Sequence, residues 1–274
     1  RQVRDLRGLG RIALAAYASV ILLPLMLLVI TTMKTTPEFY ADPLGLPRRW
    51  DFSHYRELFD GQTMWRYFGN SAVVTLSTVA LELLLAGMIA YGILRSGRKL
   101  GGFMFALFAA GLMVPSQVNM IPIYSLLRKL GWTNSLTGLV LVSAAVLLPL
   151  SVFMLSGFMR TLPKEMLEAG AIDGAGEATL LVRIVFPLCA PYLASTAAFL
   201  FVIVWNDLLF PILLVGGKDK LTLPLALLQF RGEFVTDYPM LLTGVVVSTV
   251  PMIVLFVFLQ RYFISGALAG SLKG

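Results

Sequence analysis

The chain has 274 residues, is 58% hydrophobic and 14% charged, and carries a formal net charge of +7. Its mean hydropathy of +0.82 is far above that of an ordinary soluble domain and indicates a membrane protein that crosses the bilayer several times. One histidine and one cysteine exclude a His/Cys metal cluster and a disulfide framework. We expect Cys189 to pack in an apolar stretch and His54 to lie on a loop surface.

Apolar stretches long enough to cross about 30 Å of hydrocarbon as a helix occur six times. They predict an all-α, polytopic protein with six transmembrane helices in a single transmembrane domain, residues 1–274. The predicted spans are about 12–32, 69–94, 102–125, 135–158, 188–215 and 241–263.

The first span follows four arginines and resembles a secretory signal at first sight. Its apolar run is too long for the core of a signal, and no small-x-small cleavage site follows, so we interpret it as a retained anchor.

Basic residues in the connections predict the orientation. The short link "RSGRK" (95–99) is densely basic and favours the cytoplasmic side, which puts both termini and a tail over 264–274 inside the cell. Residues 33–68 and 216–240 are then outside. We attribute the positive net charge to membrane orientation and expect lipid contact but no nucleic acid, because the basic residues form no stripe with aromatic ones.

The connection between the fourth and fifth spans is unusually polar and contains "EAGAIDGAGEATLLVRIVFP" (168–187). Pro163 suits a first helical turn, Gly174 and Gly176 are expected to stop that helix, and a second short helix is predicted from about Glu177. Small residues leave part of the first helix almost bare, which suits docking of another protein. The alternative is an amphipathic connector on the bilayer surface, which usually carries bulky apolar residues opposite a basic face.

The order Glu168-Ala169-Gly170, Gly174, Ile184 and Phe186-Pro187, with gaps of three, nine and one residues, resembles the EAA loop of binding-protein-dependent ABC importer permeases. Two positions depart from that pattern: Gly170 replaces the usual second Ala, and Phe186 replaces Leu. Four further segments are similar to the carbohydrate-uptake branch, and specifically to the smaller maltose-type permease subunit. These are "MVPSQVNMIPIYSLLRKLGWTNSLTG" (113–138), "PKEMLEAGAIDGA" (163–175), "WNDLLFP" (205–211) and "QRYFISGALAGSLKG" (260–274).

The resemblance implies the ABC importer type I permease fold, in which residues 160–187 carry a cytoplasmic coupling helix between helices 4 and 5. It implies a multi-pass protein of a bacterial or archaeal cytoplasmic membrane that works with a second permease, two ATPase subunits and an extracytoplasmic solute-binding protein. The ATPase-coupling residues it implies are Glu168, Ala169, Gly170, Asp173, Gly174, Ile184 and Pro187.

We expect no catalytic residue, metal or cofactor on this chain, with ATP and Mg²⁺ bound by the partner subunits. The chain contains no G-x-x-x-x-G-K-[ST] sequence, while "GAG" (174–176) and "GGKDK" (216–220) each lack part of a nucleotide-binding pattern.

Two acidic residues lie inside predicted spans, where a charge is costly and suggests function. In the fifth span, Trp205 could stack on a sugar face while Asn206 and Asp207 bond its hydroxyls; the alternative is an interhelical hydrogen bond that holds the bundle. Glu82, in the second span, could line a solvated path or bond a neighbouring subunit.

The predicted function is therefore a permease subunit for a sugar or sugar-like solute. Glycerol phosphate or phosphodiesters are alternative solutes. An ion-coupled secondary carrier is a further alternative, but the chain shows neither the internal repeats nor the paired intramembrane charges typical of that class.

Overall fold

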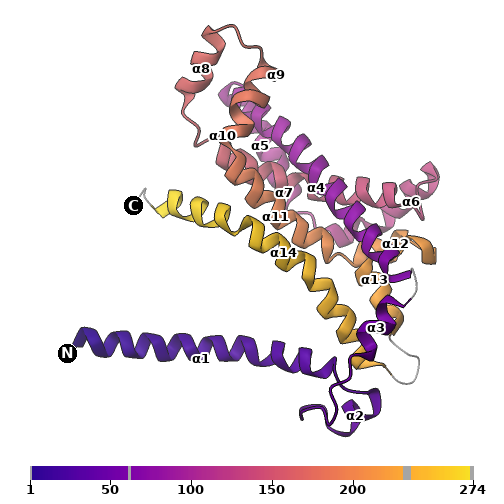
Figure 1. Cartoon of the computed structure of the whole chain (residues 1–274). Helices are drawn as coiled ribbons and strands as arrows, with labels where there is room; N and C mark the ends of the chain where they lie inside the picture. Colours follow the sequence, from indigo (N-terminus) through magenta and orange to yellow (C-terminus); the bar gives the residue numbers. More distant parts are fainter. Residues whose placement is uncertain (1, 61–62, 231–235, 272–274) are drawn as a thin grey trace. The chain divides into compact units, whose positions relative to one another are not determined.

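The computed structural model describes residues 2–60, 63–230 and 236–271, and every regular element within these ranges is helical (Figure 1). The chain forms two compact units. The first comprises residues 1–65 and 226–250, and the second comprises residues 66–225 and 251–274.

Four helices of the described chain are long and apolar enough to cross a membrane by themselves. They are α1 (Gln2–Thr31), α4 (Thr63–Arg95), α7 (Leu136–Met159) and α14 (Tyr238–Ser271). Two bent pairs pass the same test, and counting each pair as one span gives six. This count is compatible with the prediction.

The first bent pair covers the third predicted span, which is not one continuous helix. α5 (Arg98–Gly111) ends, and the 3₁₀ helix η1 (Ser116–Asn119) and α6 (Met120–Leu130) continue at an angle of 81°. Pro115 disfavours helical backbone at Val114, so the helix stops before it. Residues 112–115 thus form a non-helical break within an apolar region.

The second bent pair covers the start of the fifth predicted span. α9 (Glu177–Leu180), the π-helical turn η2 (Leu181–Val185) and α10 (Phe186–Leu188) meet α11 (Ala190–Trp205) at 77°. The same span is interrupted again after Trp205, before α12 (Leu209–Leu214). Asn206 and Asp207 favour helix ends, and Pro211 could not donate the backbone bond that a continuous helix requires.

The larger unit has a core in which α4, α7 and the 180–189 segment pack together. Ala86 and Tyr91 of α4 lie with Val152 and Leu155 of α7 in this cluster, and Cys189 is fully buried in it, as expected. The remaining short helices of the two units are α2 (Thr36–Ala41), α3 (Ser53–Phe59), α8 (Lys164–Ile172), η3 (Lys218–Lys220), α13 (Leu223–Leu227) and η4 (Leu228–Phe230).

In the smaller unit, Lys34 is almost fully buried and donates to the backbone oxygens of Asp42 and Pro43. His54 Nε2 lies 3.0 Å from the Lys34 carbonyl oxygen, and the imidazole is only 8% exposed. The expectation that His54 lies on a loop surface is therefore wrong. His54 lies in α3, and a histidine in a polar connection can be buried when a neighbouring backbone group needs a partner.

The last helix is longer than predicted. α14 runs to Ser271, so helix covers most of the 264–274 segment predicted as a tail, and residues 272–274 lie outside the described residues. Pro24, Pro149 and Pro251 lie inside long helices, as membrane helices tolerate.

Candidate functional site

We call residues 163–187 the EAA segment. It begins with the helix α8, and a glycine stops this helix. Gly174 has a positive φ of 79°, and the Ala175 amide donates to the Gly170 carbonyl at 3.0 Å. Glycine adopts this left-handed conformation without the steric penalty that other residues meet. The predicted helix–break–helix arrangement is confirmed, because α8 ends at Ile172 and α9 begins at Glu177.

One face of α8 packs on the helices that follow it. Leu167 is 5% exposed and belongs to the core of the larger unit. A Cβ at Gly170 would lie 2.7 Å from Leu180 Cδ2 and 2.8 Å from Ile184 Cδ1. Two of the predicted coupling residues, Gly170 and Ile184, therefore meet inside the segment and set how closely α8 approaches η2.

The opposite face of α8 is exposed. Glu165, Glu168 and Ala169 lie on it, and Asp173 is exposed at its end. Ile172, at the end of the helix, is 86% exposed. Sequence analysis missed Ile172; an isoleucine among small and acidic residues in a polar connection was the available signal.

Glu177 links the EAA segment to α4. Arg95 Nη2 lies 2.6 Å from Glu177 Oε1 and Arg95 Nε lies 3.1 Å from Oε2, so the guanidinium bonds both carboxylate oxygens. The Tyr91 hydroxyl donates to the same carboxylate. Such two-point pairing fixes direction as well as distance. We call Tyr91, Arg95 and Glu177 the clamp; the sequence showed Arg95 only as an orientation signal.

The end of the EAA segment also packs on α4. Phe186, at the position where the family pattern has Leu, lies against Gly87: a Cβ there would be 2.8 Å from Phe186 Cε1. The larger ring is accommodated by a glycine on the neighbouring helix. Pro187 is exposed in α10.

Asn206 and Asp207 occupy the break between α11 and α12. Asp207 Oδ1 accepts the Leu209 amide at 3.0 Å, so the carboxylate helps to start α12. The Asn206 side-chain amide donates to the Val202 carbonyl at 2.8 Å. Asp207 also lines a cavity of about 210 Å³ together with Ser116 and Gln117 of η1.

The other two intramembrane candidates are enclosed. Trp205 is 3% exposed and stacks on Phe201, with ring centroids 5.4 Å apart. Glu82 is fully buried, and within the described residues neither carboxylate oxygen has a hydrogen-bond partner. In this conformation neither side chain reaches the cavity beside Asp207.

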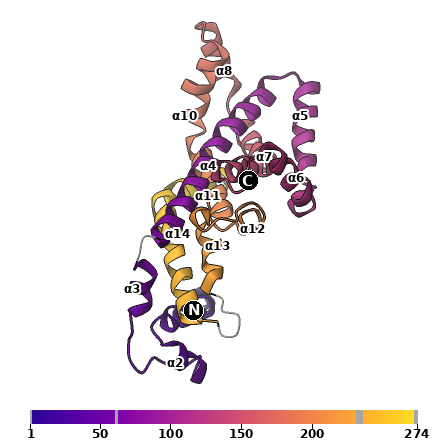
Figure 2. The ribbon, with the colours of Figure 1, turned by 90° about the vertical axis from the view of Figure 1, so that its right-hand side faces the viewer.

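The candidate residues thus fall into two groups in the larger unit. The EAA segment lies at one end of the bundle of α4, α5, α7 and α11, and α12 lies near the other end (Figures 1 and 2). The structure brings Gly170 and Ile184 together, but residues of the EAA segment are not in the described lining of the cavity beside Asp207.

Known proteins are similar to this chain in sequence and in fold. Residues 83–267 match the family model described as "Binding-protein-dependent transport system inner membrane component". The arabinooligosaccharides transport system permease protein AraQ of Halalkalibacterium halodurans is 32% identical over 267 residues, covering 96% of this chain and 95% of that protein. The diacetylchitobiose uptake system permease protein DasC of Streptomyces coelicolor is 34% identical over 257 residues, covering 92% and 91%.

The fold also matches solved structures. A chain of a bacterial ABC transporter involved in the import of the acidic polysaccharide alginate superposes with a TM-score of 0.81 at 20% identity, covering 96% of this chain and 98% of that chain. The family match spans the clamp, the breaks at 112–115 and 206–208, and the EAA segment. The chain is therefore a multi-pass membrane permease that belongs to the family of inner membrane components of binding-protein-dependent transport systems.

Proposed function

We propose that this chain is one of two permease subunits of an ATP-driven importer for a sugar or sugar-like solute. A binding protein delivers the solute to the outer face, and two ATPase subunits drive alternating access through the EAA segment. The observation that carries this proposal is the exposed face of α8, which ends at the Gly174 break within the matched family region.

The geometry of α8 supports docking to another protein over a resting place on the bilayer surface. Among the described side chains of α8, those on the exposed face include Glu165 and Glu168, and none of them is basic, whereas helices that bind anionic lipid carry basic residues. Ile172 offers an apolar contact beside Asp173, and Glu168 offers a charge for a basic partner surface. The functional coupling residues are Glu168, Ala169, Gly170, Asp173, Gly174, Ile184 and Pro187.

Oligosaccharides are the proposed solutes because the two relatives described above are permeases for arabinooligosaccharides and diacetylchitobiose. Glycerol phosphate or phosphodiesters remain the alternative class. Asn206 and Asp207 are the proposed path residues that this conformation places at a helix break, whereas Trp205 and Glu82 could line the path only after the helices around them move.

The proposed location is a bacterial or archaeal cytoplasmic membrane, with both termini and the EAA segment inside. ATP and Mg²⁺ belong to the partner subunits, and this chain performs no catalysis of its own. The C-terminal tail, 264–274, is proposed to reach toward the ATPase dimer.

The decisive experiment reconstitutes the chain in vesicles with its second permease, ATPase subunits and binding protein. We expect sugar-loaded binding protein to stimulate ATP hydrolysis and sugar uptake. Glu168→Lys should reduce both, because it reverses a charge on the docking face, while the permease still inserts. Normal stimulation in Glu168→Lys would return α8 to the status of a surface connector.

A second measurement addresses the path. Asn206→Ala and Asp207→Ala should lower sugar uptake, because a lost hydrogen bond to a bound hydroxyl costs about 1 kcal/mol. Failure of both variants to assemble with the second permease would instead assign the two side chains to holding the bundle.

A further inference from the structure

Two helix breaks meet at one small cavity in the larger unit. The break at 112–115 leads into η1, and the break at 206–208 leads into α12. The cavity of about 210 Å³ is lined by Ser116 and Gln117 beside the first break and by Asp207 in the second. Ser143 of α7 and apolar side chains such as Phe210 complete its wall.

Breaks of this kind are costly within a bilayer. Non-helical backbone at membrane depth is tolerated only where protein covers it or where it lines a water-filled cavity. Interrupted helices are also a common way to present polar groups to a transported solute. The convergence of two breaks on one cavity therefore points to a ligand.

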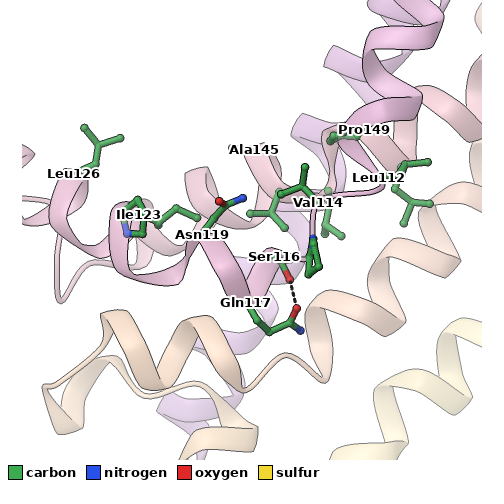
Figure 3. A pocket seen from close by; sticks show the side chains of 15 residues that line it. Leu112, Val114, Ser116, Gln117, Asn119, Ile123, Leu126, Ala145 and Pro149 are labelled. Atoms are coloured by element: carbon green, nitrogen blue, oxygen red, sulfur yellow. Dashed lines mark hydrogen bonds between the residues drawn. The ribbon is translucent and has the colours of Figure 1, made fainter.

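Gln117 lies where two cavities adjoin. A larger cavity of about 770 Å³ runs along η1, α6 and α7 and shares Ser116, Gln117, Val146 and Leu147 with the small one. Figure 3 shows Gln117 beside Ser116, while Asn119, from the same 3₁₀ helix, lies apart from both. Asn119 lines the larger cavity but not the small one.

The polar groups suit hydroxyls. Ser116 Oγ donates to Gln117 Oε1 at 3.4 Å, which leaves the side-chain NH₂ of Gln117 to donate elsewhere. Asp207 uses Oδ1 for the Leu209 amide, and a carboxylate has further acceptor capacity. The small cavity thus has an amide donor, a carboxylate acceptor and apolar side chains in its lining, which matches a sugar ring with hydroxyls at its edge and C–H groups on its faces.

Charge decides between the solute classes. Among the residues that the structure describes, Asp207 is the one ionisable side chain that lines the small cavity, and none of its other described lining residues is a lysine or an arginine. A phosphate would meet a like charge there with no cation to offset it, and like charges close together are strongly unfavourable. The cavity is also smaller than the roughly 300–1,000 Å³ of drug-sized sites, which suits one ring of a longer saccharide.

We propose that Gln117, Ser116 and Asp207 form a subsite that binds the hydroxyls of one ring of a neutral saccharide, and that Gln117 determines solute preference. This inference rests on the function proposed above and assigns its solute to the neutral class.

The test uses the complete importer in vesicles, with arabinotriose and diacetylchitobiose as neutral probes and glycerol 3-phosphate as the anionic probe. We expect wild-type vesicles to take up at least one neutral probe and not the anionic one. Gln117→Ala should lower the sugar imported per ATP hydrolysed by about fivefold, the loss expected for one neutral hydrogen bond. Asn119→Ala, the matched control, should import normally.

A second variant tests the subsite if Gln117→Ala fails to assemble with the other subunits. Gln117→Cys in a Cys189→Ala background should react with a small maleimide, and the imported sugar delivered by its binding protein should slow this reaction. The subsite would be overturned if Gln117→Ala imported sugar as well as wild type, or if Asn119→Ala lost as much uptake as Gln117→Ala. It would also be overturned if the sugar did not protect the cysteine at position 117, or if the vesicles took up glycerol 3-phosphate. Absence of any stimulated ATP hydrolysis in wild-type vesicles would instead overturn the proposed function.

Discussion

At the scale of single residues, the EAA segment depends on two glycines that do different things. Gly174 provides a left-handed backbone, and nothing lies within 4 Å of the position where its Cβ would be. Gly170 has ordinary helical backbone, but the ends of Leu180 and Ile184 occupy the space of a side chain. Substitutions at Gly174 therefore test conformation, whereas substitutions at Gly170 test packing.

Gly174→Val should destabilise the break by about 1–2 kcal/mol, because a residue with a Cβ pays that amount in left-handed backbone. β-branching adds to the strain. Gly174→Asn is the matched variant, since asparagine tolerates this conformation. We expect the valine variant to insert but to retain less ATPase partner on purification, and the asparagine variant to retain it. Equal partner retention in both variants would show that the left-handed turn is not needed for coupling.

Gly170→Ala should be tolerated. Its methyl group requires the flexible tips of two side chains to shift, and alanine favours a helix over glycine by about 1 kcal/mol. Gly170→Ile requires α8 itself to move away. We expect binding-protein-stimulated ATP hydrolysis close to wild type for alanine and strongly reduced for isoleucine. Loss of stimulation in Gly170→Ala would mean that the contact of position 170 with Leu180 and Ile184 cannot accommodate even a methyl group.

At the scale of elements, the clamp joins the second half of the EAA segment to α4. The side chains of Arg95 and Glu177 are 36% and 60% exposed, so solvent screens their ion pair and it adds little stability. Its geometric role is larger, because the Tyr91 hydroxyl and two guanidinium nitrogens hold one carboxylate. A displacement of the loop can thus pass to a membrane helix by a route other than the chain into α11.

Arg95→Gln and Glu177→Gln should therefore leave thermal unfolding of the purified permease nearly unchanged but lower sugar uptake per ATP hydrolysed. Arg98→Gln, in the same basic link, serves as the control and should behave like wild type. The double variant Arg95→Glu with Glu177→Arg should recover part of the coupling. Normal sugar uptake per ATP hydrolysed in both single variants would remove the clamp from the coupling route. So would a loss in the single variants that the charge exchange does not recover at all.

At the scale of the whole molecule, composition and the length of the apolar stretches were enough for the all-α class and for six apolar regions. The breaks within the third and fifth regions escaped because a short non-helical stretch barely changes the hydropathy of a long window. Pro115 and the pair Asn206–Asp207 carried the local signal. The clamp could not be predicted at all, because Arg95 and Glu177 are 82 residues apart and each is ordinary in its own segment.

The helix–break–helix form of the EAA segment was predictable because glycine and proline act locally. Which face of α8 is exposed was not, because that depends on contacts such as Gly170 with Leu180. The burial of His54 was missed for a similar reason, since a backbone carbonyl twenty residues earlier provides its partner.

The orientation of the whole chain can be measured with single cysteines in a Cys189→Ala background. Cys189 is fully buried, so its removal should cost packing but leave no reactive background. Ile172 is 86% exposed on α8, and Leu44 is 76% exposed in the predicted outer loop, so both positions can react. The chain should be produced without its ATPase subunits, because a docked partner would shield residue 172. With the basic link 95–99 inside, Leu44→Cys should react with an impermeant maleimide in intact cells, and Ile172→Cys only after permeabilisation. Labelling of Ile172→Cys in intact cells would invert the topology and make contact between α8 and a cytoplasmic ATPase impossible.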